Sequence, residues 1–228
     1  MKPRERIIVA LDLPTAEEAL SLVRRLSPHP GLFKIGLQLY TAAGPEIVRA
    51  VRDLGGRIFL DLKLHDIPNT VDRAVESAGS LGVEMLTIHL CGGRAMIEAA
   101  VSAAVPDLLL LGVTVLTSTD EATLREVGVC SSMQDQVLRL AELGVEGGIG
   151  GIVASPHEVA ALRSAHGSKI KIITPGIRPA DSPAADQKRA MTPAEALKAG
   201  ADFLVIGRPI TSAPDPRAAL EQIVANAV

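Results

Sequence analysis

The sequence has very few aromatic side chains: no Trp, one Tyr and three Phe among 228 residues. Proteins that bind single-stranded nucleic acids use aromatic rings as stacking platforms for the bases. The formal net charge of −3 also gives no electrostatic basis for binding a nucleic acid backbone or an anionic membrane surface. We therefore expect neither nucleic acid nor membrane as a partner.

Cysteine and long apolar runs are scarce as well. Cys91 and Cys130 are too few for a disulfide framework, and the Cys and His residues lack the spacing of metal ligands. The longest apolar run, Leu108 to Leu116, is too short to cross a bilayer. The first ten residues pass from charge directly into strand-like residues, unlike a signal peptide. We expect a soluble cytoplasmic protein without a metal.

Short β-rich runs recur along the whole chain. Eight of them are found, at residues 6–12, 32–36, 57–63, 84–89, 107–116, 151–155, 169–176 and 202–207. Between them lie segments with apolar residues at three- and four-residue spacing, which is typical of amphipathic helices. Thr15 with Glu18 predicts the start of one such helix, and Thr192-Pro193 with Gly200 predicts both ends of another.

The strand-like runs are almost continuously apolar, which favours a parallel sheet covered on both faces. Eight strand-then-helix units in a chain of this length predict an α/β fold, the (β/α)8 or TIM barrel. No linker or low-complexity segment divides the chain, so we expect one domain over residues 1–228. A doubly wound open sheet is the structural alternative.

Polar residues collect where the predicted strands end. In barrels of this class the active site lies at the carboxyl ends of the strands. The residues in question are Asp12, Lys34, Asp61, Lys63, His89, Thr117, Ser118, Pro175, Arg178, Gly207 and Arg208. Any one of them alone is more often a surface or satisfied polar residue, but so many at one rim predict a functional site.

Asp61 and Lys63 are two residues apart, so in a regular strand they point to the same face. With Lys34 they can form an alternating Lys–Asp–Lys row. A buried ion-pair network that only fixes the barrel is the alternative, but such networks contribute weakly to stability. Adjacent carboxylates favour a charged ammonium, which suits a general acid or an electrostatic stabiliser better than a Schiff-base nucleophile.

Two arginines follow the seventh and eighth predicted strands, in TPGIRP (174–179) and IGRP (206–209). Barrels commonly bind phosphate in these two loops. Gln187, in the polar segment between them, offers another hydrogen bond. The glycine-rich GGIGG at 147–151 does not indicate a dinucleotide site, because it precedes a strand instead of joining a strand to a helix.

The segment DLKLHDI (61–67) resembles the Asp-x-Lys-x-x-Asp-Ile signature of the orotidine 5'-phosphate decarboxylase family. Blocks similar to that family's occur in its order along the chain: ALD (10–12), FKIG (33–36), VLTS (115–118), TPGIRP (174–179), DQKR (186–189) and IGRPI (206–210). The resemblance implies decarboxylation of orotidine 5'-monophosphate to uridine 5'-monophosphate, the last step of pyrimidine nucleotide synthesis, without metal or organic cofactor.

The resemblance also implies roles for individual residues. Lys63 would protonate C6 of the pyrimidine, within a charged network of Lys34, Asp61, Lys63 and Asp66. Asp66, Ile67 and Thr70 would complete the site of the neighbouring subunit, so a homodimer is implied. Substrate contacts would come from Asp12 and Lys34 at the ribose, Thr117 and Ser118 near the base, and Arg178, Gln187, Gly207 and Arg208 at the phosphate. Pro175 would be a further substrate contact.

Two other functions remain possible from the sequence. One is a metal-dependent sugar-phosphate decarboxylase or aldolase of the same barrel superfamily. The other is a non-catalytic nucleotide-binding protein, which the intact Asp61, Lys63 and Asp66 disfavour. The polar segment 179–189 is the expected lid. His65 and His89 are expected to serve packing or to support the catalytic groups.

Overall fold

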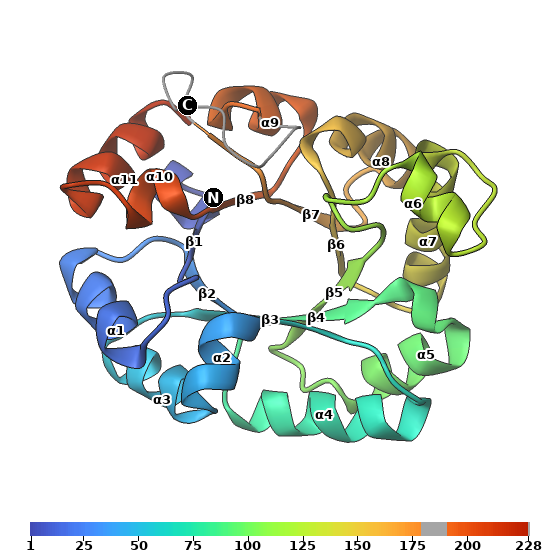
Figure 1. Ribbon diagram of the computed structural model, residues 1–228, viewed down its shortest axis with the longest axis horizontal. Helices are drawn as coiled ribbons and strands as arrows, with labels where there is room; N and C mark the ends of the chain where they lie inside the picture. Colours follow the sequence, from blue (N-terminus) through green and yellow to red (C-terminus); the bar gives the residue numbers. More distant parts are fainter. Residues whose placement is uncertain (179–190, 228) are drawn as a thin grey trace.

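The computed structural model describes residues 1–178 and 191–227. Its parallel strands form a closed barrel in which each strand pairs with the next and β8 pairs with β1 (Figure 1). The strands are β1 (Ile7–Ala10), β2 (Leu32–Gly36), β3 (Ile58–Leu64), β4 (Met85–His89), β5 (Leu109–Val113), β6 (Gly151–Val153), β7 (Lys171–Thr174) and β8 (Phe203–Ile206). The predicted (β/α)8 barrel is confirmed, and the open-sheet alternative is wrong because the pairing of β1 with β8 leaves no edge strand.

The helices surround the barrel as an outer ring (Figure 1). They are α1 (Ala16–Arg25), α2 (Leu37–Ala43), α3 (Glu46–Asp53), α4 (Pro68–Ser80), α5 (Arg94–Ala103), α6 (Glu121–Glu126), α7 (Met133–Glu146), α8 (Val159–His166), α9 (Pro193–Ala199), α10 (Arg208–Thr211) and α11 (Pro216–Ala225). Short 3-10 turns lie at Pro3–Arg6, Leu90–Gly92 and Pro156–Glu158.

The predicted helix ends follow local side-chain chemistry. The Thr15 hydroxyl accepts the backbone N–H of Glu18 at 3.2 Å and caps α1. Thr192 and Glu195 form a reciprocal capping box at the start of α9, and Gly200 ends that helix with φ +113°. A left-handed backbone suits glycine because it has no Cβ.

Apolar side chains fill two layers. The larger layer lies between the strands and the helices. The smaller one fills the barrel interior with Ile8, Ala10, Leu32, Phe59, Met85, Leu111, Ile173, Phe203 and Val205. Because side chains alternate along a strand, the next inward positions after Leu32, Phe59 and Met85 are Lys34, Asp61 and Thr87. The barrel interior therefore changes from apolar to polar toward the carboxyl ends of the strands.

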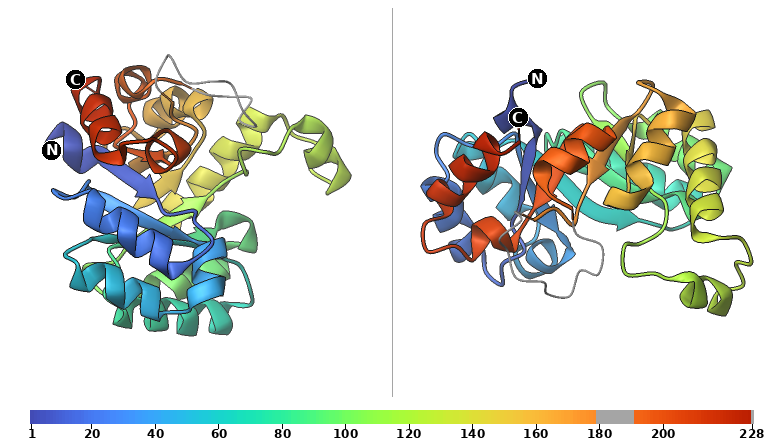
Figure 2. Two further views of the ribbon diagram at one scale, coloured as in Figure 1. Left: turned by 60° about the vertical axis from the view of Figure 1, so that its left-hand side comes forward. Right: turned by 90° about the horizontal axis from the view of Figure 1, so that it is seen from above.

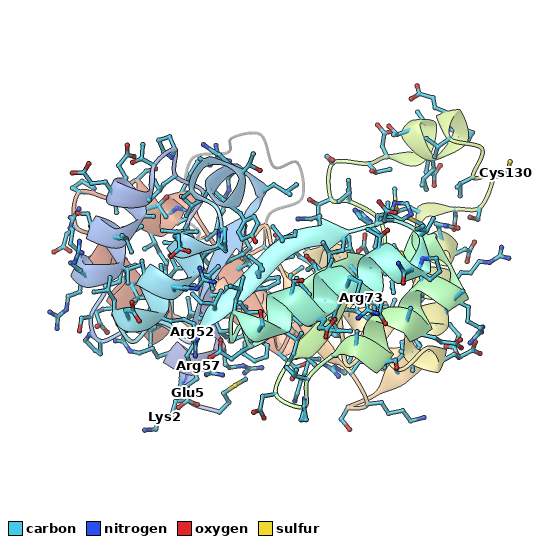
Figure 3. All side chains as sticks on the ribbon, turned by 90° about the horizontal axis from the view of Figure 1, so that it is seen from below. Lys2, Glu5, Arg52, Arg57, Arg73 and Cys130 are labelled. Carbon is cyan, nitrogen blue, oxygen red and sulfur yellow. The ribbon has the colours of Figure 1, made fainter. Side chains whose placement is uncertain are left out.

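The two ends of the barrel differ. Figure 3 shows Lys2, Glu5 and Arg57, which precede β1 and β3, at the end opposite α6. The segment that carries α6 stands away from the barrel in both views of Figure 2, and Figure 3 shows the exposed Cys130 on this segment. Within the described part of the chain, no helix has the length and apolar character of a membrane span.

Candidate active site

A cavity of about 450 Å³ opens at the carboxyl ends of the strands. This volume is within the range of small-molecule sites, about 300–1,000 Å³. Its floor includes apolar side chains of the barrel interior, among them Phe59 and Val205. Its charged lining consists of Asp12, Lys34, Asp61, Lys63, Arg178 and Arg208. Residues from five strands or their following loops thus meet at one rim, as the sequence predicted.

The charged groups at the carboxyl ends of β1 to β3 alternate in sign. The Lys34 ammonium lies 2.9 Å from Asp12 Oδ1 and 3.5 Å from Asp61 Oδ2. The Lys63 ammonium donates to Asp61 Oδ1 at 2.8 Å. We call Asp12, Lys34, Asp61 and Lys63 the charged row. The Lys34 and Asp61 side chains are only 11% and 12% exposed, so these charges interact with little screening by water.

Asp61 is the centre of this row. Burial by itself raises the pKa of its carboxyl, but the charges of Lys34 and Lys63 and hydrogen bonds from Lys63 and Thr87 outweigh burial. The net effect holds the pKa of Asp61 below its usual value of 3.8. The carboxylate is therefore ionised at neutral pH, and it fixes two ammonium groups at the edge of the cavity.

The backbone at Lys63 departs from a regular strand. Leu60 pairs with Leu86 and Leu64 with Ile88, so β3 contains extra residues between these pairs. Lys63 has φ +51°, the only positive φ of a non-glycine residue in the described chain. This left-handed conformation costs a non-glycine residue roughly 1–2 kcal/mol. The predicted meeting of Asp61 and Lys63 is confirmed, but the regular strand assumed for it is wrong at this point.

Two residues at the row were not predicted from the sequence. At Gly36 a Cβ would lie 3.0 Å from the Lys34 ammonium and 3.2 Å from Asp12 Oδ1, so a larger residue would crowd that ion pair. Thr87 is fully buried in β4 and contacts both Asp61 and the backbone of Lys63. Its only sequence signal is a hydroxyl residue inside the apolar run Met85–His89.

The cavity also carries other residues expected to contact the substrate, which follow β5, β7 and β8. Thr117, Pro175, Arg178, Gly207 and Arg208 all belong to its lining. The Arg178 guanidinium comes from the loop after β7, and that of Arg208 from the first residue of α10, which follows β8. Gln187 and the expected lid at 179–189 lie outside the described residues.

Some expected site residues do not line this cavity. Ser118 is exposed beside Thr117. Asp66, Ile67 and Thr70 are also exposed, and the Ile67 side chain is accessible over 66% of its surface. Asp66 Oδ1 accepts the backbone N–H of Ile67 at 2.7 Å. Within one chain, Asp66 is therefore not part of the charged row.

His65 and His89 lie next to Lys63. Their ring centroids are 5.8 Å apart. Burial lowers the pKa of His89, and the nearby charges of His65 and Lys63 lower it further against the opposing effect of Asp61. A neutral imidazole thus borders the charged row at neutral pH.

The fold and this rim define a class: a (β/α)8 barrel with a charged small-molecule site at the carboxyl ends of its strands. Residues 5–223 match the family model described as "Orotidine 5'-phosphate decarboxylase / HUMPS family". The chain belongs to this family.

Individual relatives agree with the family match. The chain is 52% identical to orotidine 5'-phosphate decarboxylase of Moorella thermoacetica, over 99% of the chain and 93% of the relative. It is 55% identical to the enzyme of that name from Opitutus terrae, over 96% of the chain and 97% of the relative. The crystal structure of orotidine 5'-phosphate decarboxylase from Lactobacillus acidophilus superposes with a TM-score of 0.87 at 37% identity, covering 97% of this chain and 98% of that one.

Proposed function

We propose that this chain decarboxylates orotidine 5'-monophosphate to uridine 5'-monophosphate and carbon dioxide, the last step of de novo pyrimidine nucleotide synthesis. The observation that carries the proposal is the Lys63 ammonium, held by Asp61 at 2.8 Å on the edge of the cavity. The relatives of that name, about half identical over nearly the whole chain, support the same reaction. The substrate is a small charged nucleotide, and a cytoplasmic location would give the enzyme access to it.

The chemistry requires a cation beside one carbon atom. When the bond from C6 to the carboxylate breaks, the electron pair stays on C6 and carbon dioxide leaves. A fixed ammonium next to C6 stabilises this carbanion electrostatically and then donates a proton to it. We assign this role to Lys63, which afterwards regains its proton from solvent. Neither step calls for a metal or an organic cofactor.

Asp61 and Lys34 would support Lys63 in two ways. Asp61 holds the ammonium in place, and Lys34 keeps Asp61 ionised and anchored from the other side. Such preorganised charge needs no rearrangement when the carbanion forms. Asp12 and Lys34, which form an ion pair on the cavity lining, are also assigned to the ribose.

The phosphate would bind to the two arginines of the cavity. Arg178 and Arg208 both line it, and arginine recognises phosphate by paired hydrogen bonds. Gly207 and Gln187 are assigned to the same group, and Thr117 and Ser118 to the base, with Pro175 as a further substrate contact. Binding energy from a phosphate far from C6 can support the chemical step if it helps to position the base.

A homodimer with two composite sites is part of this proposal. Asp66, Ile67 and Thr70 do not line the cavity of their own chain and are exposed. Ile67 is 66% exposed, and contact with another chain would remove this apolar surface from water. We assign these three residues to the neighbouring subunit's site, where Asp66 would extend the charged row.

The direct test is to mix the purified protein with orotidine 5'-monophosphate and EDTA and to follow the ultraviolet absorbance of the base. We expect conversion to uridine 5'-monophosphate at the same rate with and without EDTA. Activity that survives the chelator excludes the metal-dependent sugar-phosphate enzymes as the explanation. No change in absorbance would refute the proposed reaction.

A further inference from the structure

The Thr87 hydroxyl contacts both Asp61 and the backbone of Lys63. Its Oγ1 accepts the backbone N–H of Lys63 at 2.8 Å and donates to Asp61 Oδ1 at 3.0 Å. Thr87 is completely buried in β4, below the cavity. Thr87 does not line the cavity, so it is not among the residues proposed to contact the substrate.

The contact to Lys63 lies where the backbone is strained. Between the pairs Leu60–Leu86 and Leu64–Ile88 the regular register is interrupted, and Lys63 takes φ +51° in this interval. The Thr87 hydroxyl supplies an acceptor for the Lys63 N–H at this point. A non-glycine residue keeps such a conformation only when its surroundings hold it there.

The second contact of the Thr87 hydroxyl is with the Asp61 carboxylate, the central charge of the row. Asp61 Oδ1 accepts from both the Lys63 ammonium and the Thr87 hydroxyl. One side chain on β4 therefore orients the carboxylate and the backbone that carries its ammonium partner. A valine has nearly the same shape as threonine but can make neither contact.

We infer that Thr87 is a positioning residue for the decarboxylation: it holds the Lys63 backbone in its left-handed conformation and fixes Asp61 against the Lys63 ammonium. The inference rests on the proposed function. A threonine at this place matters through its hydroxyl, and the methyl group only fills space. Loss of the hydroxyl misplaces the ammonium, and a misplacement of about 1 Å affects the chemical step more than substrate binding.

The test compares Thr87→Val with Thr87→Ser. We expect Thr87→Val to lower kcat by about 10²-fold, the typical effect of a small misplacement, while KM stays within a few-fold. Thr87→Ser, which keeps the hydroxyl, should recover most of kcat. Thr114→Val is the matched control, because Thr114 is buried at the end of β5 and its hydroxyl has no partner in the described chain. It should keep the wild-type kcat.

A pH profile separates positioning from simple packing. Thr87 is one of the groups that lower the pKa of Asp61, so Thr87→Val should move the acid limb of kcat to higher pH. The titratable groups near Asp61 are Lys34 on β2, Lys63 on β3 and His89 on β4, with His65 next to His89. Thr87→Val changes none of them. If Thr87→Val does not fold, Thr87→Cys replaces it, since a thiol is a poor hydrogen-bond partner of similar size.

Two results would overturn the inference. One is a folded Thr87→Val enzyme with wild-type kcat and an unmoved acid limb; the other is Thr87→Ser as impaired as Thr87→Val. A wild-type protein without activity on orotidine 5'-monophosphate would instead refute the proposed function. In that case the role of Thr87 can still be tested without substrate, by following the carboxyl ¹³C shift of Asp61 against pH by NMR. A pKa of Asp61 that Thr87→Val leaves unchanged would refute the role of Thr87.

Discussion

At the scale of single residues, the site depends on charges that hold one another in place. Asp61 lies between Lys34 and Lys63 and is ionised although it is buried. An uncompensated charge at this position would be costly to desolvate. Each ammonium therefore has a carboxylate partner before any substrate binds, and the two positive and two negative charges of the row set the electric field at its edge.

His89 provides a residue-scale test of this field. Its pKa lies below the ordinary value of 6.5 because of burial and the charges of His65 and Lys63. Since protonation is disfavoured in the folded state, His89 adds no cost to folding above pH 6.5, and the folded state loses stability as the pH falls below that value. NMR titration should find His89 below 6.5 and find its pKa raised by His65→Asn.

A His89 that titrates at or above 6.5 in the wild-type protein would contradict the field described for the row.

At the scale of elements, the segment from β3 to α4 carries two groups of residues, one that lines the cavity and one that is exposed. Asp61 and Lys63 point into the cavity of their own barrel, whereas Asp66, Ile67 and Thr70 are exposed around the start of α4. The irregular backbone at Lys63 separates these two groups. If the neighbouring subunit's site uses the second group, each site draws on two chains.

Mixed dimers test this arrangement. Lys63→Ala and Asp66→Asn homodimers should both be nearly inactive. After unfolding and refolding of an equal mixture, half of the dimers are mixed, and each has one intact site. Activity should therefore recover to about a quarter of the wild-type value in a symmetric dimer with random assortment. Light scattering measures the oligomeric state in parallel.

The matched control mixes Lys63→Ala with Lys34→Ala. Both residues serve the site of their own chain, so a mixed dimer has no intact site and activity should not recover. Equal recovery in both mixtures, or none in the first, would contradict the composite site.

At the scale of the whole molecule, periodicity and composition predicted the eight strands, because nearly continuous apolar runs separated by helical spacing leave few other folds. Closure of the barrel was not decided by that pattern, since it depends on the pairing of β1 with β8, nearly 200 residues apart. The rim residues were predicted from their place at strand ends. Thr87 and the irregular backbone of Lys63 were not, because their importance arises from contacts between neighbouring strands.

In the proposed reaction the proton donor and the phosphate contacts belong to different strands. Lys63 is on β3, whereas the two cavity arginines follow β7 and β8. A change at Lys63 should therefore affect turnover much more than nucleotide binding. This separation is the central expectation of the proposed reaction.

The most direct measurement is turnover of orotidine 5'-monophosphate by Lys63→Ala, together with calorimetric binding of uridine 5'-monophosphate. We predict that turnover falls by about 10³-fold or more, since both the stabilising charge and the proton donor are lost, while binding stays measurable. Lys198→Ala, an exposed lysine on α9, should match the wild type in both measurements. Turnover by folded Lys63→Ala within tenfold of the wild-type rate would contradict the assignment of Lys63 as the proton donor.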